Sequence, residues 1–449
     1  MGKKITEYIG GRLTTAQTLI FGYVIFITIG SVLLMLPISV EGDETLSLVD
    51  AVFTTASSIS GTGLIVEDTA TYFSLFGQMV IMVLIQIGNI GYMIFFALAV
   101  VIFGGRLSLF NKLIIKESIS HSKLSLMQFI VKVFKYTLVI EGVAALLLSV
   151  YWMQEMTLFE AIKQGIFHSV SAFCTAGFSL FSDNLMGYRD DYFVNAVILA
   201  ASYAGCIGFF VMYDLSSGIK ASLKKVKYKL STHSKLVLAV SLGITLLSTG
   251  LIFLIENTIS ETGEASTFLE SVFQATSAST SVGFNTVNIA NLEQSSQLGI
   301  IIEMFIGASP SGTGGGIKTT VFAIMCLSLL AFIRDRKYVN TLHRSIHPAT
   351  IARAFSISLL ALFWLLFTTM FLNITEDQQF LSLLFESASA LGNNGLSTGI
   401  TSSLSIPGKI ILSLSMIIGR VGPLIVGYTL LGRQKAVNYQ YPEGNILIV

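Results

Sequence analysis

The sequence predicts an all-α integral membrane protein in which four repeated units surround a single pseudo-fourfold axis. Three observations carry this prediction. The 449-residue chain is 53% hydrophobic and only 12% charged, about half the charged fraction of a soluble domain. Long apolar runs recur along the chain, and one short motif occurs four times at nearly constant intervals. Internal repetition sets the architecture, because each repeat must bury its apolar face against its neighbours.

The repeated motif is a phenylalanine, a serine four residues later and a glycine six residues after that. Its glycines lie 114, 106 and 112 residues apart. Residues i and i+4 share one helix face, so we expect the aromatic rings to pack in the core. Glycine adopts positive φ freely and lets main chains approach closely, which suits strands whose carbonyls point at an axis. The copies are Phe53, Ser57, Gly63; Phe167, Ser171, Gly177; Phe273, Ser277, Gly283; and Phe385, Ser389, Gly395.

Eight apolar runs are candidate membrane spans, two in each repeat. A hydrocarbon core roughly 30 Å thick needs about 20 residues. Three of the runs carry isolated charges: Glu141 in the first, Glu303 and Lys318 in the second, and Arg420 in the third. Those three are residues 136–154, 294–333 and 410–432, and the uncharged runs are residues 13–40, 69–105, 192–213, 236–255 and 354–375.

Between the two spans of each unit lies an apolar segment of only 12 to 14 residues. That is too short to cross and has the length of a re-entrant helix. Irregular backbone at membrane depth survives only where it is buried in protein or lines a water-filled path, so four re-entrant helices predict one shared pore. The short segments are residues 49–60, 160–173, 266–279 and 380–391. The units are residues 1–110, 111–218, 219–338, whose second helix is broken, and 339–449, which includes a tail.

Charge predicts the orientation in the membrane. Of 27 Lys and Arg residues, 22 lie in the leader, in residues 106–135, 220–235 and 334–353, and in the tail. Of 26 Asp and Glu residues, 19 lie in the alternate segments. Basic loops stay in the cytoplasm, so both termini of this multi-pass protein are predicted to be cytoplasmic, and the motif opens outward. The net charge of +1 gives no reason to expect a nucleic-acid partner.

The strands that end at the four glycines are candidates for a cation selectivity filter. Rings of backbone carbonyls can replace the hydration shell of an ion, and these strands share no ionisable group. Each short helix directs its negative dipole end at the following strand. The acidic outer loops would concentrate cations at the mouth. The candidate filter residues are Ser60, Gly61, Thr62, Gly63; Cys174, Thr175, Ala176, Gly177; Thr280, Ser281, Val282, Gly283; and Gly392, Asn393, Asn394, Gly395.

Two features break the fourfold symmetry. In the third unit, the stretch from Gly307 to Lys318 contains too many glycines, together with Pro310, for a continuous helix. We interpret it as a flexible gate below the filter; the alternative is a kinked helix. The candidate gate residues are Gly307, Gly312, Thr313, Gly314, Gly315, Gly316 and Lys318.

The second feature is Arg420. An intramembrane charge is expensive and is a functional hypothesis by default. Facing the pore, Arg420 would raise the barrier to cations that leave the filter. The alternative is a structural ion pair with Glu303 or Glu141.

At these residues the chain resembles the Trk/Ktr/HKT family of potassium transporters, specifically its Ktr-type membrane subunit. The resemblance implies potassium uptake across the cytoplasmic membrane, with potassium bound at the filter. Sodium-selective relatives often carry serine where Gly63 stands, which favours potassium here. The gating loop of the family corresponds to Gly307 to Lys318, and its pore arginine to Arg420.

The same resemblance implies partners. Ktr membrane subunits form homodimers, with one pore in each subunit, on a cytosolic ring of separate nucleotide-binding regulatory subunits. A tail like Tyr441 to Val449 reaches the dimer interface in this family. No cofactor is expected in this chain itself, and coupling of potassium transport to Na⁺ stays open.

Other classes of function are weighed against this interpretation. His168, beside Ser169 and Ser171, could suggest an intramembrane hydrolase. No further acid–base group recurs with them, however, and the fourfold motif already accounts for Ser171. A membrane scaffold without transport would not need four re-entrant loops. Within transport, sodium or ammonium is the alternative cargo.

Overall fold

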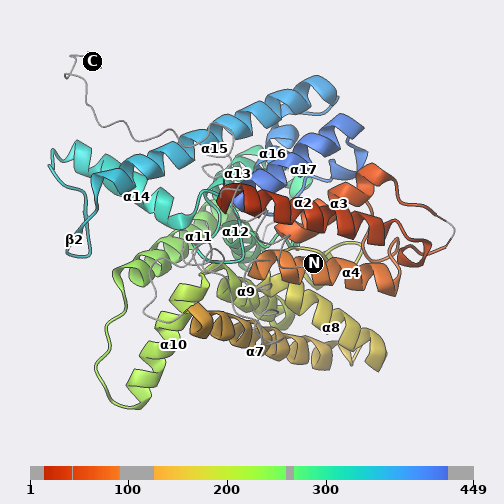
Figure 1. Cartoon of the computed structure of the whole chain (residues 1–449), viewed down its shortest axis with the longest axis horizontal. Coiled ribbons are helices and arrows are strands. Elements are labelled where there is room, and N and C mark those ends of the chain that lie inside the picture. Colours follow the sequence, from red (N-terminus) through yellow and green to blue (C-terminus); the bar gives the residue numbers. More distant parts are fainter. Residues whose placement is uncertain (1–14, 43, 92–125, 259–266, 423–449) are drawn as a thin grey trace, which may run out of the picture.

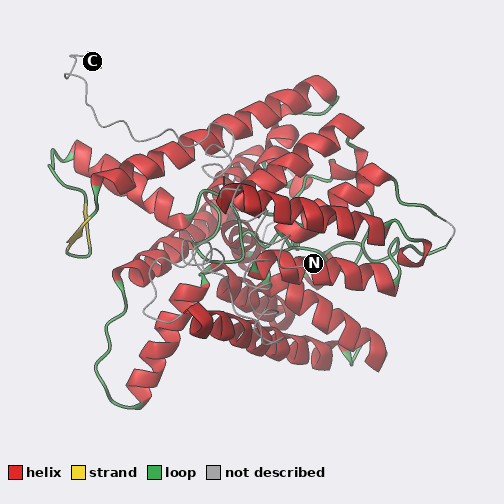
Figure 2. Cartoon of the chain, viewed as in Figure 1, coloured by secondary structure: helices red, strands yellow, loops and turns green. Residues whose placement is uncertain are grey.

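The computed structural model describes residues 15–42, 44–91, 126–258 and 267–422, and the regular secondary structure of this part of the chain is almost entirely helical (Figures 1 and 2). Its two strands, β1 (Asn340–Thr341) and β2 (Arg344–Ser345), form one small antiparallel hairpin. The basic leader, the segment of residues 92–125 and the tail expected at a dimer interface lie outside the described residues.

The helices repeat in the same order in each unit: a first helix, a short helix, a loop that contains the motif glycine, and a second helix. Unit one has α2 (Thr15–Leu34), α3 (Leu48–Ser60) and α4 (Leu75–Ile90). Unit two has α7 (Leu126–Trp152), α8 (Leu158–Phe173), α9 (Tyr192–Cys206) and α10 (Phe209–Leu223). Unit three has α11 (Thr232–Thr258), α12 (Phe268–Thr280), α13 (Gln294–Ile306) and α14 (Thr319–Ile333). Unit four has α15 (Pro348–Thr375), α16 (Phe380–Gly392) and α17 (Ile406–Val421).

Local signals explain where the short helices begin. Ser47 and Thr267 accept hydrogen bonds through their side chains from the main-chain N–H of Asp50 and Glu270, respectively. Thr157 forms a full capping box with Glu160. Such caps satisfy main-chain donors that the helix leaves unpaired. All four short helices begin and end within two residues of the ranges expected from sequence.

Within the described residues, three helices are long and apolar enough to cross a membrane, namely α7, α11 and α15, and α9 with α10 could form a fourth, bent span. The run of residues 192–213 is not one straight helix, because the chain bends by 104° between α9 and α10. Gly208 lies at this bend with φ +91°, and an added Cβ would overlap the carbonyl oxygen of Pro310. Close packing against the third unit therefore requires glycine there.

The units pack in a closed cycle. The second helix of each unit contacts the short helix of the next: α4 contacts α8, α9 contacts α12, α13 contacts α16, and α17 contacts α3. In Figure 1, α17 lies beside α3 although the two come from opposite ends of the chain. The motif phenylalanines are buried. The first helices expose large apolar side chains, such as Leu138 on α7 and Phe363 on α15, as expected of a surface that faces lipid.

Candidate functional site

The four motif glycines form a closed ring. A Cβ added to Gly63 would overlap the carbonyl oxygen of Ala176 in unit two, and the same relation continues around the cycle. The φ angles of the four glycines lie between +67° and +94°, a region that L side chains adopt only with strain. Four main-chain segments therefore approach one axis. The remaining contacts join Gly177 to Val282, Gly283 to Asn394, and Gly395 to Thr62.

Each strand leaves its short helix through the same turn. Two residues before the motif glycine, the chain adopts a left-handed conformation, at Gly61, Thr175, Ser281 and Asn393, with φ between +46° and +67°. Three of these residues are not glycine, and each such conformation costs of the order of 1–3 kcal/mol unless the surroundings enforce it. The next residue then donates its N–H to the carbonyl of the motif serine in all four units, at 2.8–3.1 Å.

The motif serines hold the strands in place. All four are fully buried. Ser57 and Ser389 accept hydrogen bonds from the N–H of Gly63 and Gly395, at 3.1 and 3.0 Å. In units two and three, Ser171 and Ser277 instead donate to the carbonyl of the residue after the glycine, Phe178 and Phe284, at 2.8 and 2.6 Å. The serine-to-glycine spacing thus fixes a strand against its helix.

A cavity of about 420 Å³ opens directly over the ring. Gly63, Gly177 and Gly395 form part of its wall, and the carboxylates of Glu67, Asp68 and Asp183 line it, with no lysine or arginine among the described lining residues. Burial, reinforced by the negative charge of Asp50, raises the pKa of Glu67 above its ordinary value. The arrangement attracts cations to the ring.

The predicted gate residues form an irregular loop between α13 and α14 that packs against three of the four strands. Thr313 Oγ1 lies 3.1 Å from Thr175 Oγ1 in unit two. A Cβ at Gly315 would overlap the carbonyl oxygen of Gly392 in unit four. A Cβ at Gly314 would lie 2.9 Å from the carbonyl oxygen of Thr280 in unit three.

The glycines of this loop allow close packing. Gly307 and Gly316 have φ of +66° and +78° and lie against each other, and a Cβ at Gly312 would overlap the carbonyl oxygen of Cys206. Lys318 Nζ donates to the carbonyls of Gly314 and Gly315 at 2.6 and 3.2 Å. Lys318, at the end of the loop, therefore stabilises the conformation of the loop through these two hydrogen bonds.

Arg420 joins the loop to the first unit. Its guanidinium donates to the carbonyl oxygens of Gly88 and Asn89 at 3.1 and 3.0 Å, and to that of Thr313. Within the described residues Arg420 forms no ion pair with Glu141 or Glu303. The structural ion pair considered from sequence is therefore not present in this part of the chain. The positive charge instead lies among main-chain carbonyls next to the loop.

His168 has a structural role. It is fully buried, its Nδ1 lies 2.9 Å from the carbonyl oxygen of Gln164, and its Nε2 lies 3.0 Å from Ser179 Oγ. The ring stacks against Phe181. Neither serine named from sequence pairs with His168, because Ser171 donates to the carbonyl of Phe178 and Ser169 to that of Ile166.

Sequence reasoning missed a second glycine repeat. Gly88, Gly205 and Gly419 lie in the second helices, and a Cβ at each would overlap a carbonyl oxygen near the end of a short helix, at Ile59, Phe173 and Leu391. The signal was present, since these glycines follow the motif glycine by 25, 28 and 24 residues. It was hidden among the 39 glycines of the chain.

A closed ring of four main-chain segments, in a bundle whose outer helices expose apolar side chains, is the arrangement expected of a membrane protein that transports cations. Comparison with known proteins agrees. Residues 13–435 match the model of the TrkH family, described as cation transport protein, and the chain belongs to this family. The protein is thus a transmembrane transporter and not an enzyme.

Relatives match over nearly the whole chain. The Ktr system potassium uptake protein B of Bacillus subtilis is 36% identical over 441 residues, 97% of each chain. The potassium/sodium uptake protein NtpJ of Enterococcus hirae is 30% identical over 447 residues, 97% of this chain and 98% of that one. The crystal structure of the potassium transporter TrkH from Vibrio parahaemolyticus superposes with a TM-score of 0.71 at 19% identity, covering 94% of this chain and 86% of that one, which shows a shared fold.

Proposed function

We propose that this protein takes up potassium across the cytoplasmic membrane through the ring of main-chain carbonyls. The observation that carries the proposal is the closed glycine ring, in which Gly63, Gly177, Gly283 and Gly395 each face a carbonyl oxygen of the next unit. Carbonyl oxygens can replace the water around an ion. The names of the relatives in Bacillus subtilis and Vibrio alginolyticus, which are potassium uptake proteins, favour potassium as the cargo.

The arrangement that we propose has eight spans, with the four short helices re-entering from the outer face. The units are those expected from sequence, residues 1–110, 111–218, 219–338 and 339–449. Both termini lie in the cytoplasm, since basic residues mark the cytoplasmic loops. The acidic cavity then faces outward, where it collects cations.

Passage is controlled below the ring. The loop from Gly307 to Lys318 packs under three strands and obstructs the path. Arg420 tethers the loop to unit one and places a positive charge on the exit route. Opening requires the loop to leave the strands.

Control of the loop comes from other proteins. Because relatives are named as parts of a Ktr system, we propose that a separate cytosolic ring of nucleotide-binding subunits regulates a homodimer of this chain. Sodium is the second ion to test as a coupling ion, since one relative is named a potassium/sodium uptake protein.

The test is flux through the full-length protein in liposomes. Rubidium or potassium uptake should exceed sodium uptake at equal concentrations and should vanish in protein-free vesicles. Uptake of sodium or ammonium in preference to potassium would show that potassium is not the transported ion. Adding sodium to the potassium assay decides whether transport is sodium-dependent.

A further inference from the structure

Behind the second filter strand lies a buried contact between a carboxyl, an amide and a thiol. Gln86 Nε2 donates to Glu141 Oε2 at 2.9 Å. Cys174 Sγ lies 3.3 Å from Gln86 Oε1 and 3.7 Å from Glu141 Oε1. Glu141 is only 6% exposed, and Cys174 is fully buried. The three side chains come from α4, α7 and the end of α8, so the contact joins two units.

The other three strands have no equivalent contact. Their first residues are Ser60, Thr280 and Gly392. Ser60 and Thr280 donate to carbonyls four residues earlier in their own short helices, at 2.6 and 2.7 Å, and Gly392 has no side chain. Among the four strands, all of which lie in the described part of the chain, only the second is held through its first side chain by a carboxyl from another helix.

Burying the Glu141 carboxyl costs free energy, which points to a functional role for this contact. A carboxyl buried without a cation carries a desolvation penalty, and Glu141 forms no ion pair within the described residues. The two residues after Cys174 matter for transport. Thr175 is left-handed and contacts Thr313 of the loop, and Ala176 supplies the carbonyl that faces Gly63. Fixing Cys174 therefore fixes the start of a strand that touches both the ring and the loop.

We propose that Glu141, acting through Gln86 and Cys174, positions the second filter strand and thereby sets the discrimination between potassium and sodium. The inference rests on the proposed function. Selection by a carbonyl ring depends on where its oxygens lie. A strand released from Glu141 can move away from the axis and carry the Ala176 carbonyl with it. Glu141 is a positioning residue and does not touch the ion.

The test compares potassium and sodium flux through full-length protein in liposomes, with thermal unfolding measured on the same samples. Glu141→Leu removes the acceptor of Gln86 Nε2 and the more distant of the two acceptors of Cys174 Sγ. We expect the potassium-to-sodium flux ratio to fall about tenfold, the scale found when residues that orient ion ligands are removed. Leu138→Ala, at a position on the same helix that is 66% exposed, serves as the control and should keep the wild-type ratio.

A swap separates positioning from folding. Glu141→Gln leaves one oxygen where the carboxyl has two, so it cannot accept from both Gln86 Nε2 and Cys174 Sγ, and the ratio should fall. Glu141→Gln combined with Gln86→Glu restores a carboxyl–amide pair and should recover it. This comparison also decides the matter if Glu141→Leu does not fold. An unchanged ratio in folded Glu141→Leu, or equal ratios in the single and swapped variants, would overturn the inference. Absence of potassium flux in wild-type vesicles would overturn the proposed function itself.

Discussion

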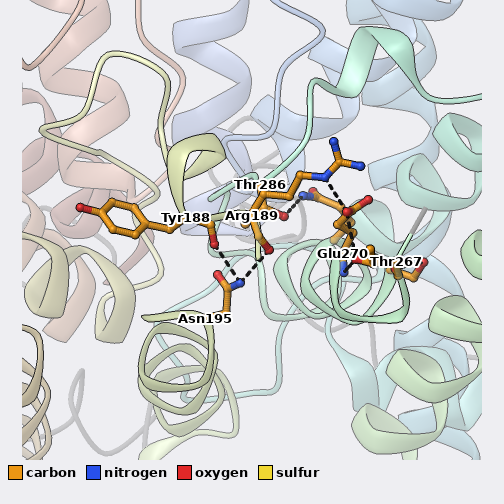
Figure 3. Close-up of polar contacts among 8 residues, drawn as sticks. Tyr188, Arg189, Asn195, Thr267, Glu270 and Thr286 are labelled. Carbon is orange, nitrogen blue, oxygen red and sulfur yellow. Dashed lines mark hydrogen bonds and ion pairs between the residues drawn. The ribbon is translucent and has the colours of Figure 1, made fainter. Parts of the chain in front are cut away.

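The guanidinium of Arg189, in unit two, lies 2.5 Å from Glu270 Oε1, the acid in the first turn of the short helix of unit three (Figure 3). A second ion pair of this kind, here called a tie between units, joins unit four to unit one. Lys409 lies 2.7 Å from Asp50, the acid in the first turn of the short helix of unit one. In both cases a basic side chain of one unit forms an ion pair with the acid in the first turn of the next unit's short helix. These two ties join neighbouring units on opposite sides of the ring.

Breaking the ion pair between Arg189 and Glu270 should destabilise the protein. Arg189→Ala leaves the buried carboxyl of Glu270 without its cation. Removing one partner of a fully buried pair costs about 3–5 kcal/mol, and because the Arg189 side chain is 38% exposed, solvent screening reduces the expected loss to about 1–2 kcal/mol. Thermal unfolding in detergent measures this. Adding Glu270→Gln should recover part of the loss; a double variant less stable than Arg189→Ala would contradict the argument.

Gly63→Ser should reduce the preference for potassium over sodium. Gly63 has φ +88°, and the new Cβ would overlap the Ala176 carbonyl, which must then move. A left-handed serine also costs about 1–2 kcal/mol. Gly42→Ser is the matched control, because Gly42 has φ +74° with nothing within 4 Å of an added Cβ and does not line the cavity over the ring. Flux ratios in liposomes distinguish the two. Equal ratios in both variants would mean that the ring does not select the ion.

Deleting residues 312–316 should raise potassium flux in the absence of any regulatory partner. The deletion removes the segment that packs under the strands, together with the carbonyls of Gly314 and Gly315 that Lys318 holds. Rubidium uptake measures the change. If the folded variant shows unchanged or abolished uptake, the loop is a kink in a helix and not a gate.

Arg420→Gln should speed uptake by roughly tenfold, about 1.4 kcal/mol off the barrier. It removes the positive charge and weakens the contacts with Gly88, Asn89 and Thr313. Arg420→Lys separates these effects, because lysine keeps the charge but not the forked hydrogen bonding. If uptake by Arg420→Lys stays slow, the positive charge forms the barrier. If uptake is fast in both Arg420→Lys and Arg420→Gln, the hydrogen bonds that hold the loop form the barrier. A large loss of stability without faster uptake would make Arg420 structural.

Potassium uptake should weaken as the external pH falls. Burial and the charge of Asp50 raise the pKa of Glu67, so this carboxylate takes up a proton at a higher pH than an ordinary glutamate. Protonation removes negative charge from the cavity above the ring and lowers the local cation concentration. Glu67→Gln should flatten the pH dependence of uptake at low potassium, whereas Glu155→Gln, at an exposed position, should not.

The sign of the effect on stability follows from the same shift. Because the folded state holds the Glu67 proton more tightly, this group favours folding more as the pH falls and less as it rises. Glu67→Gln should therefore be slightly more stable than wild type at neutral pH. Thermal unfolding at two pH values tests this; a loss of stability at neutral pH would contradict it.

The length and apolar character of the short segments predicted the short helices to within two residues. The caps formed by Ser47 with Asp50 and by Thr267 with Glu270 act within one helical turn and explain where two of these helices begin. The motif spacing also marked the strands, because the serine and the glycine belong to one hydrogen-bonded turn. Such features depend on residues that are close in sequence.

Features that depend on distant packing could not be predicted. The bend at Gly208 results from contact with Pro310, and the Glu141 contact needs Gln86 and Cys174 from two other helices. Two of the three carbonyls that accept from the Arg420 guanidinium belong to unit one, more than 330 residues earlier. Sequence patterns mark Pro310 and Cys174, but no pattern shows which distant residue each partner contacts.

The closing contacts of the ring bear on how the protein is made. Asn393 Nδ2 donates to Thr62 Oγ1 at 2.9 Å across 331 residues, and Gly395 faces the carbonyl of the same threonine. During synthesis, the first strand lacks these contacts until the fourth unit emerges. Domains otherwise tend to fold in order from the N-terminus. A chain that ends before the last unit would therefore hold three units with the ring left open between Gly283 and Gly63.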